Sequence, residues 1–390
     1  MFTKNDTFEQ IMRTDPIRRA IGNLFPSCWL HRIPPQHAAY TMSQIEAEDT
    51  MEWGVPFQSD AFIESANLLM ETADNHRFLF LPLWDPDNRD SQWIPDADTN
   101  CASTVSLFTG NPAIDNTAFA HTAQGSSVPP YPTNAVPAEK REALTERPAV
   151  IICPGGGYEM LSAHSEGIQL AQRMERDGGY KAFILSYRIT PNTYPLPQMD
   201  LALAILHVRA RAKLYQIDPA RIFVVGSSAG GHLCASEAYL HETLKRDVLA
   251  ELDRRQIQPD TRKSFQDCSA RPDGIGLLYP VISFLSEYHE GSCLNLTNGA
   301  PDLRELLSVE THITSTSPPV YAFANQDDGS VPVSNTTRLE KALQNAGIPH
   351  LCQVYPSGDH GIGLGYECSC KRWSEEMLAF FEQVSKKQEP

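Results

Sequence analysis

The second half of the chain alternates short apolar runs with longer amphipathic segments. The apolar runs have the length of strands and lie at 149–153, 181–187, 221–225, 273–279, 320–324 and 350–355. Helical spacing is found at about 165–177, 197–215, 233–240, 333–346 and 373–384. Near-continuous apolar strands that alternate with helices predict an α/β fold, a mostly parallel sheet with helices on both faces. Functional side chains in such sheets gather at the carboxyl ends of the strands.

The first part of the chain has a different pattern, which is mainly helical over residues 1–76. The helical spacing of the apolar residues in 60–72, DAFIESANLLMET, predicts an amphipathic helix. Residues 43–46, SQIE, have the form of a capping box at a helix start. Two further runs, 77–81 and 103–108, read as short strands.

A long irregular stretch separates these two parts. Residues 111–148 are rich in Pro, Ala, Ser and Thr, which is typical of a surface excursion or a linker. We therefore divide the chain into a helical accessory or cap region, 1–100, and an α/β domain, 101–390. Three roles are open for the first region: it covers the site, pairs subunits into a homo-oligomer, or packs behind the sheet.

Composition excludes several partners. The chain has 390 residues, of which 41% are hydrophobic and 21% charged, as in an ordinary globular enzyme. Its formal net charge of -16 would repel the phosphates of nucleic acids and anionic membranes. The longest apolar run near a helix, 201–206, is far too short to span a bilayer.

Cysteine usage and the first residues indicate a reducing compartment. Residues 1–22 carry charges throughout and lack the apolar core of a signal peptide. The 9 cysteines are irregularly spaced, so we expect free thiols and a cytoplasmic protein. Cys368 and Cys370 form a Cys-x-Cys pair with no second pair after it, and we expect no metal there.

The stretch at residues 226–233, GSSAGGHL, carries the clearest chemistry. A β-branched run precedes it and a helical segment follows, which is the strand–turn–helix setting of a Gly-x-Ser-x-Gly nucleophile elbow. Gly226 and Gly230 leave room for a sharp turn that exposes the hydroxyl of Ser228. The helix N-terminus would aim backbone N–H groups at a developing negative charge. The alternative is a small-residue turn where a strand packs closely on a helix.

A serine nucleophile needs a base, and the base needs a group to orient it. Two loops after later strands, 325–332 and 356–363, offer these groups at the same edge of the sheet. The resulting chain order, Ser, Asp, His, is the one that this mechanism uses on this kind of sheet.

His360 is the predicted base, because glycines around it leave its side chain free; the alternative is a solvated loop histidine. The acid is Asp327 or Asp328, and we prefer Asp328 for its spacing from the Val-Pro that opens the next helix. Asp327 would then cap or support the loop. Asp359 adjoins the histidine in sequence and should point away from it.

A glycine-rich loop at residues 154–158, PGGGY, follows an earlier predicted strand. Its consecutive N–H groups, with that of Ala229, can stabilise the oxyanion formed when an ester carbonyl is attacked. We assign this role to Gly156, Gly157 and Ala229; the alternative is a flexible turn.

Weaker candidates surround this loop. Tyr158, His164 and Glu166 follow the glycines and are candidates to line the acyl or alcohol side of a substrate. His232, on the helix after the elbow, is expected to be buried and hydrogen-bonded rather than catalytic. The insertion 281–317, with His289, is a candidate lid.

Five motifs together show a family resemblance. They are CPGGGY at 153–158, GSSAGGHL at 226–233, RPDGIGLLYPVIS at 271–283, QDDGSVPV at 326–333 and GDHGIGLG at 358–365. In this combination and order they resemble the α/β-hydrolase esterases of the acetyl-esterase and acetylxylan-esterase type, over about 148–386. Pro154 stands where lipase-like relatives carry a histidine, as in the acetyl-esterase branch, and residues 1–110 have no recognised counterpart.

The resemblance implies an α/β-hydrolase fold, a Ser228–Asp328–His360 triad and release of short acyl groups, often acetyl from plant-polysaccharide fragments. The expected function is therefore a serine esterase with a small-molecule or oligosaccharide ester as substrate. It needs neither a cofactor nor a metal. One alternative is a peptidase of the same fold, which is disfavoured because no propeller-sized domain precedes the catalytic region. The other is a non-catalytic scaffold.

Overall fold

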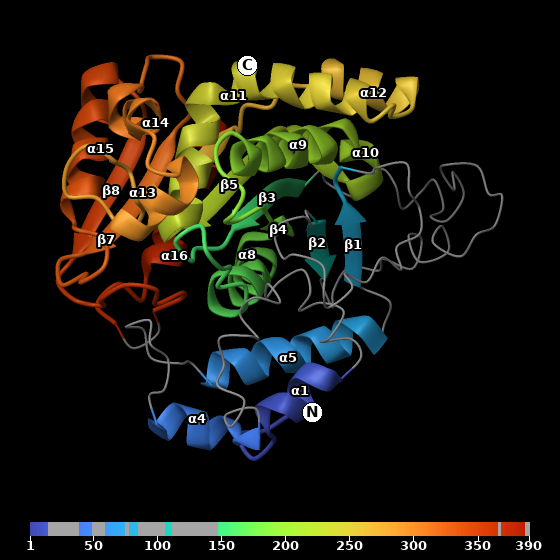
Figure 1. The fold of residues 1–390 in the computed structure, drawn as a ribbon, viewed down its shortest axis with the longest axis vertical. Helices are drawn as coiled ribbons and strands as arrows, with labels where there is room; N and C mark the ends of the chain where they lie inside the picture. Colours follow the sequence, from blue (N-terminus) through green and yellow to red (C-terminus); the bar gives the residue numbers. More distant parts are fainter. Residues whose placement is uncertain are drawn as a thin grey trace.

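A central sheet organises the molecule (Figure 1). The structure is a computed structural model and describes residues 1–14, 39–48, 59–74, 78–84, 106–110, 147–365 and 368–386. The strands are β1 (Phe78–Pro82), β2 (Ser106–Gly110), β3 (Arg147–Cys153), β4 (Lys181–Ser186), β5 (Ile217–Ser227), β6 (Gly274–Leu278), β7 (Val320–Asn325) and β8 (His350–Tyr355). They form one eight-stranded sheet in the order β1-β2-β4-β3-β5-β6-β7-β8. The pairings from β4 to β8 are parallel, while β2 pairs antiparallel with both β1 and β4.

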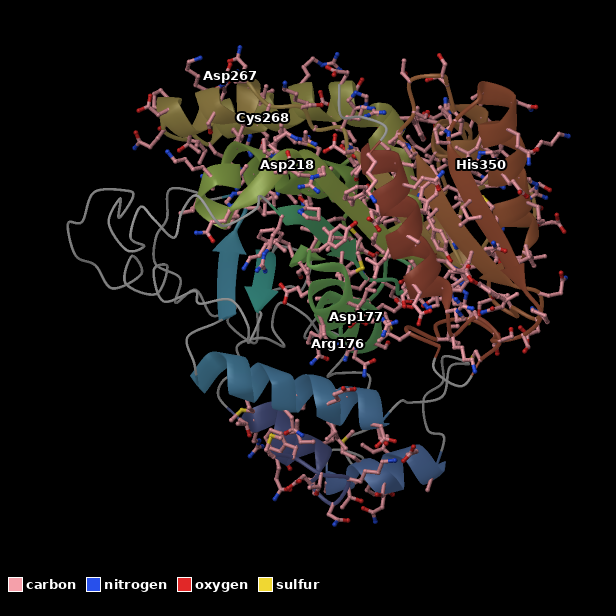
Figure 2. All side chains as sticks on the ribbon, turned by 180° about the vertical axis from the view of Figure 1, so that it is seen from behind. Arg176, Asp177, Asp218, Asp267, Cys268 and His350 are labelled. Atoms are coloured by element: carbon pink, nitrogen blue, oxygen red, sulfur yellow. The ribbon has the colours of Figure 1, made fainter. Side chains whose placement is uncertain are left out.

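Helices cover both faces of this sheet, as the alternating pattern predicts. The helices are α8 (Gln169–Gly178), α9 (Leu196–Ala210), α10 (Ala212–Tyr215), α11 (Ser228–Arg254), α12 (Pro259–Gln266), α15 (Ser334–Ala346) and α16 (Trp373–Lys386). Alternate residues of β3 show the two layers. Ile151 joins the core under α9, α11 and α15, whereas Val150 and Ile152 join the core under α8 and α16. Figure 2 shows the molecule from behind, with Arg176 and Asp177 near the end of α8.

Two helices differ from their predicted extent. The segment predicted at 165–177 begins with one π-helical turn, η3 (His164–Ile168), before α8. The elbow helix α11 extends beyond the predicted 233–240, through a charged stretch to Arg254. Its inner face stays apolar there, because Leu244, Val248 and Leu252 recur at four-residue spacing and are fully buried.

The insertion at 281–317 is structured. It contains α13 (Glu290–Thr297), α14 (Pro301–Leu306) and the short 3₁₀ helix η4 (Val309–Thr311). No helix in the described ranges has both the length and the hydropathy of a membrane span.

The N-terminal helices α1 (Phe8–Arg13), α4 (Met42–Glu48) and α5 (Ser59–Asp74) lie on the α8 side of the sheet (Figure 1). Phe8 and Phe62 join the core beneath α8 and α16. The capping box predicted at 43–46 is wrong: Thr41 and Gln44 exchange the two cap hydrogen bonds, one residue before α4 starts. The domain boundary at residue 100 stays a prediction, although β1, which precedes it, is the outer strand of the same sheet.

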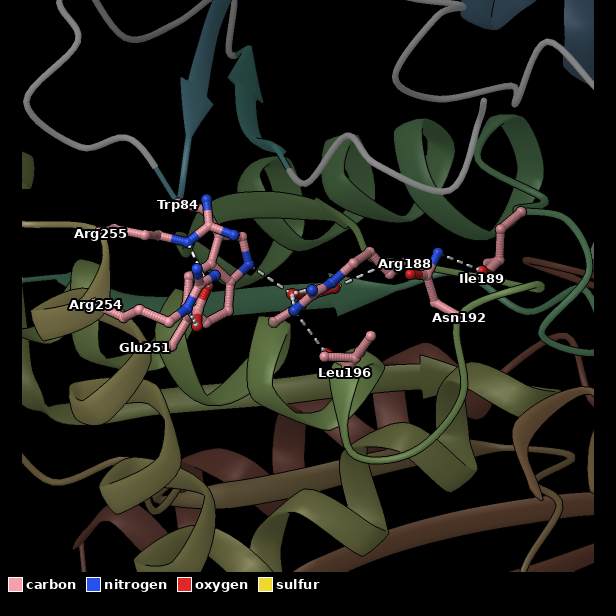
Figure 3. A network of polar contacts seen from close by, with 9 residues as sticks. Trp84, Arg188, Ile189, Asn192, Leu196, Glu251, Arg254 and Arg255 are labelled. Carbon is pink, nitrogen blue, oxygen red and sulfur yellow. Dashed lines mark hydrogen bonds and ion pairs between the residues drawn. The ribbon is translucent and has the colours of Figure 1, made fainter. Parts of the chain in front are cut away.

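A polar network fastens the end of β1 to the helical layer (Figure 3). The guanidinium groups of Arg188 and Arg255 both pack on Trp84, each 5.1 Å from its ring centre. Its indole N–H donates to Asp200 at 2.7 Å, and Asp200 also pairs with Arg188 at 2.6 Å. Asp200 is fully buried on α9, so this charge is stabilised by its partners rather than by water.

Candidate active site

The turn between β5 and α11 has the geometry of a nucleophile elbow. Ser228 begins α11 with a φ of 51°, a strained value for a residue with a side chain. A Cβ on Gly226 would overlap the carbonyl of Gly230, and a Cβ on Gly230 would overlap the carbonyl oxygen of Cys153. Both glycines are therefore required by close backbone approach, which confirms the sequence argument for the turn.

The three side chains predicted to act together are hydrogen-bonded in a row. His360 Nε2 lies 2.9 Å from Ser228 Oγ, and His360 Nδ1 lies 2.8 Å from Asp328 Oδ2. The other oxygen, Asp328 Oδ1, accepts from the N–H groups of Ser330 at 2.9 Å and Val331 at 2.8 Å. Because an ionised carboxylate only accepts, the imidazole proton lies on Nδ1 and the Nε2 lone pair faces the serine.

The neighbouring carboxylates tie the two loops together instead of touching the imidazole. Asp327 Oδ1 accepts from the N–H groups of Gly358 and Asp359, both at 2.9 Å. Asp359 Oδ1 accepts from the N–H of Gly329 at 3.1 Å. Of the two acids left open by the sequence, Asp328 is thus the one in contact with the histidine, and Asp327 supports the loop as expected.

The glycine loop after β3 adjoins the elbow. β3 and β5 run side by side up to Cys153 and Gly226, so the two turns leave the sheet together. A Cβ on Gly155 would lie 3.0 Å from Ser228 Cβ, which shows how closely the loop approaches the serine.

Donors on this loop and on the elbow helix are available for a ligand. Gly156 and Gly157 have φ values of 130° and 64°, and none of the described residues accepts a hydrogen bond from their N–H groups. Ala229 lies in the first turn of α11, whose N-cap side chain, that of Ser227, makes no capping hydrogen bond. The predicted donors therefore lie on turns that meet beside Ser228.

Two of the three predicted substrate residues face the interior, so that prediction is wrong for them. Tyr158 is 0% exposed, and its hydroxyl donates to Nδ1 of His232 at 2.8 Å. Glu166 is 3% exposed, and both of its oxygens accept from protein donors. The positive φ of Tyr158, 59°, accompanies this inward direction. His164 lies in η3, but its side chain is outside the described part of the structure.

His232 is buried and hydrogen-bonded, as expected. Its Nε2–H donates to the carbonyl of Leu307 at 2.7 Å, which leaves Nδ1 to accept from Tyr158. Burial lowers the pKa of His232 to about 4, although the bond to Leu307 acts in the opposite direction. The imidazole is therefore neutral near pH 7 and serves as a structural link.

Sequence reasoning did not identify Tyr279 as part of the site. Tyr279 follows β6 directly, and its ring packs edge-on against His360 with centroids 4.9 Å apart. Its position at the carboxyl end of a parallel strand was a signal that could have found it.

The insertion reaches the glycine loop through α13. Asn295 Nδ2 donates to the carbonyl of Gly157 at 2.9 Å. His289 caps α13 by accepting the N–H of Ser292 at 3.1 Å, and a Cβ on Gly157 would lie 3.6 Å from its Cε1. Burial, followed by the charge of His360, lowers the pKa of His289. The lid role stays a prediction, but part of the insertion does contact this loop.

Within the described ranges, no group of three or more His, Cys, Asp or Glu side chains could hold a metal ion. The cysteines of these ranges are free thiols.

Comparison with known proteins now identifies the family. Residues 136–343 match the family model described as BD-FAE, which is more than half of the chain. The chain belongs to the BD-FAE family. This confirms the resemblance found in the motifs, and the matched segment includes Ser228 and Asp328.

Two curated relatives of this BD-FAE chain are longer proteins. Endo-1,4-beta-xylanase B of Butyrivibrio fibrisolvens is 32% identical over 235 residues, which are 59% of this chain and 34% of that protein. Acetylxylan esterase of Xylanibacter ruminicola is 31% identical over 235 residues, 57% of this chain and 43% of that protein. This chain thus spans less than half the length of either relative.

Among solved structures, an acetyl ester-xyloside bifunctional hydrolase from Caldicellulosiruptor lactoaceticus is 30% identical, with a TM-score of 0.57. The match covers 78% of this chain and 96% of that one. The predicted α/β-hydrolase fold is therefore confirmed for the BD-FAE chain.

Proposed function

We propose that this BD-FAE protein is a carboxylic ester hydrolase that uses Ser228 as its nucleophile. The observation that carries the proposal is the hydrogen-bonded row from Asp328 through His360 to Ser228, with distances of 2.8 and 2.9 Å. Such a row on an elbow turn gives a serine hydroxyl the base and the orienting carboxylate that acyl transfer needs. The names of the relatives, which include acetylxylan esterase, support the same class.

The geometry supports a two-step reaction. As Ser228 Oγ attacks the ester carbonyl, its proton passes to His360 Nε2, and the carbonyl oxygen becomes an oxyanion. The tetrahedral intermediate collapses, the proton passes from His360 to the leaving alkoxide, and an acyl-serine remains. A water molecule then gives a proton to His360 and attacks the acyl-serine. Collapse of the second intermediate releases the acid and returns the proton to Ser228.

Three backbone groups are placed to stabilise both oxyanions. The N–H groups of Gly156, Gly157 and Ala229 lie on the two turns that meet beside Ser228. Removing one such donor typically lowers kcat by about 10²–10³. This stabilisation of the oxyanions needs no metal, since the donors are backbone groups.

For the substrate, we infer a short acyl ester, acetyl above all, on a carbohydrate such as an acetylated xylan or mannan oligosaccharide. The support is the naming of the relatives as acetylxylan esterase and acetyl ester-xyloside hydrolase. We also propose a cytoplasmic location, which is inferred from the irregular spacing of the cysteines in the sequence.

The experiment is to measure acetate release from acetylated xylo- and manno-oligosaccharides, beside a series of short-chain p-nitrophenyl esters. We expect release from the oligosaccharides, and a loss on the order of 10⁶ in kcat for Ser228→Ala. Ser264→Ala, on the surface helix α12, is the matched control and should keep wild-type activity. Hydrolysis of p-nitrophenyl esters alone would refute the carbohydrate substrate. Full activity of Ser228→Ala would refute the mechanism.

A further inference from the structure

One buried carboxylate joins the glycine loop to the opposite side of the site. Glu166, on η3, accepts the N–H of Gly155 through Oε2 at 2.8 Å. Through Oε1 it accepts the hydroxyl of Tyr279, also at 2.8 Å. Gly155 directly precedes the predicted oxyanion donors, so Glu166 fixes the orientation of the first peptide of that loop.

The same tyrosine holds the loop that carries the histidine. Tyr279 Oη accepts the N–H of Gly363 at 3.1 Å, and its ring packs against the imidazole of His360. Because the Gly363 N–H can only donate, the phenol proton is free to point at Glu166. The three hydrogen bonds from Gly363 to Tyr279, from Tyr279 to Glu166 and from Gly155 to Glu166 then each have a defined donor and acceptor.

Burying a carboxylate in this position is costly, so its presence requires an explanation. Burial raises the pKa of Glu166, while its hydrogen bonds from Tyr279 and Gly155 and the charge of His360 oppose that change. Both Glu166 oxygens accept from donors, and no described residue accepts a proton from the carboxyl group. The group therefore acts as a two-sided acceptor between two loops.

We propose that Glu166 and Tyr279 are positioning residues that hold the oxyanion loop and the histidine loop in register around Ser228. The inference rests on the proposed ester hydrolysis, since it concerns the preorganisation of that site. Stabilisation of an oxyanion depends on donors that are already in place, and a displacement of about 1 Å can cost about 10²-fold in rate.

Two substitutions interrupt this connection at different points. Glu166→Gln leaves one acceptor oxygen and adds an NH₂ group, so the side chain can no longer accept from both Gly155 and Tyr279 in the same geometry. Tyr279→Phe keeps the ring beside His360 but removes the hydroxyl, which leaves the Gly363 N–H without its acceptor. Tyr215→Phe is the matched control: it removes another buried phenol, bonded to His207 at 2.9 Å on α10.

The test is steady-state hydrolysis of p-nitrophenyl acetate, together with the inhibition constant of a trifluoromethyl ketone that forms a tetrahedral adduct. For Glu166→Gln and Tyr279→Phe we expect kcat to fall about 10- to 100-fold, with KM changed less than about threefold. Inhibitor affinity should weaken in proportion to kcat/KM, because the adduct uses the same oxyanion donors. The double variant should be no slower than the slower single variant.

A purely structural role predicts another pattern: a lower Tm with kcat per folded molecule unchanged, as for Tyr215→Phe. That pattern, or kcat within about twofold of wild type in both variants, would overturn the proposal. If one variant does not fold, the other decides by the same criteria. When wild type is active and Ser228→Ala is not, normal kinetics in these variants refute this inference alone. An inactive wild type would overturn the proposed function and this inference together.

Discussion

Replacing Asp328 with asparagine tests the hydrogen-bonded row, because the structure dictates how the new amide must face. Two backbone N–H groups, of Ser330 and Val331, hold Oδ1 at 2.9 and 2.8 Å. An asparagine would keep its oxygen there and turn its NH₂ group toward His360 Nδ1. The imidazole would then have to accept at Nδ1 and carry its proton on Nε2, where it could no longer take the proton of Ser228.

We therefore expect Asp328→Asn to lower kcat by about 10⁴, equivalent to about 5 kcal/mol in the barrier, with little change in Tm. The matched control is the same substitution at the adjacent residue. Asp327 accepts two backbone N–H groups through Oδ1, and an amide oxygen can do the same, so Asp327→Asn should stay within about tenfold of wild type. Saturation kinetics with p-nitrophenyl acetate measure both. More than about a tenth of wild-type kcat in Asp328→Asn, or an equal loss in Asp327→Asn, would refute the reasoning.

Three further predictions follow from the packing. Gly230→Ala would push a Cβ into the carbonyl oxygen of Cys153, so we expect esterase activity to fall more than about 10²-fold. A wild-type rate would contradict the claim that the elbow turn requires glycine at this position. Asp200→Ala removes the carboxylate that pairs with the Arg188 guanidinium, and urea unfolding should show a free energy of unfolding lower by about 3–5 kcal/mol. A change under about 1 kcal/mol would show that the ion pair contributes little to stability. Burial lowers the pKa of His232 to about 4 in the folded protein, against 6.5 for an ordinary imidazole in the unfolded chain. Between pH 4 and 6.5 the unfolded chain therefore binds more protons than the folded protein. Stability should then fall by up to about 3 kcal/mol from pH 6.5 to 4, and His232→Gln should flatten that fall; parallel curves would contradict it.

The proximity of the three proposed catalytic side chains could be predicted because each carries a local signature. Ser228 lies between an apolar strand and a helix, and Asp328 and His360 each follow a later strand at the same sheet edge. Parallel topology converts these separate sequence positions into neighbours. Spacing from the following Val-Pro favoured Asp328 over Asp327, but only the structure gives the directions of these two adjacent side chains.

Side-chain direction and long-range contacts explain what the sequence could not supply. Tyr158 and Glu166 are close to the glycine loop in sequence, but they point inward to His232 and Tyr279. The link between Tyr279 and Gly363 joins positions 84 residues apart, and no local pattern encodes it. These contacts depend on how loops meet above the sheet, which periodicity does not determine.

The extent of the elbow helix shows the same limit at the level of secondary structure. The predicted helix ended at residue 240, before a charged stretch, yet α11 continues through that stretch to Arg254. A sparse apolar spacing, Leu244, Val248 and Leu252, suffices to keep one face buried while the charges face water. Charge density alone was therefore a poor indicator of where the helix ends.

The central claim is that Ser228 is an activated nucleophile, and reaction with a fluorophosphonate probe tests it most directly. The purified protein is incubated with the probe, and the modified peptide is located by mass spectrometry, with Ser228→Ala and Asp328→Asn beside wild type. We predict one adduct per chain on Ser228, none at this site in Ser228→Ala, and much slower labelling in Asp328→Asn. An unlabelled wild type, or an adduct on another residue that persists in Ser228→Ala, would contradict the account.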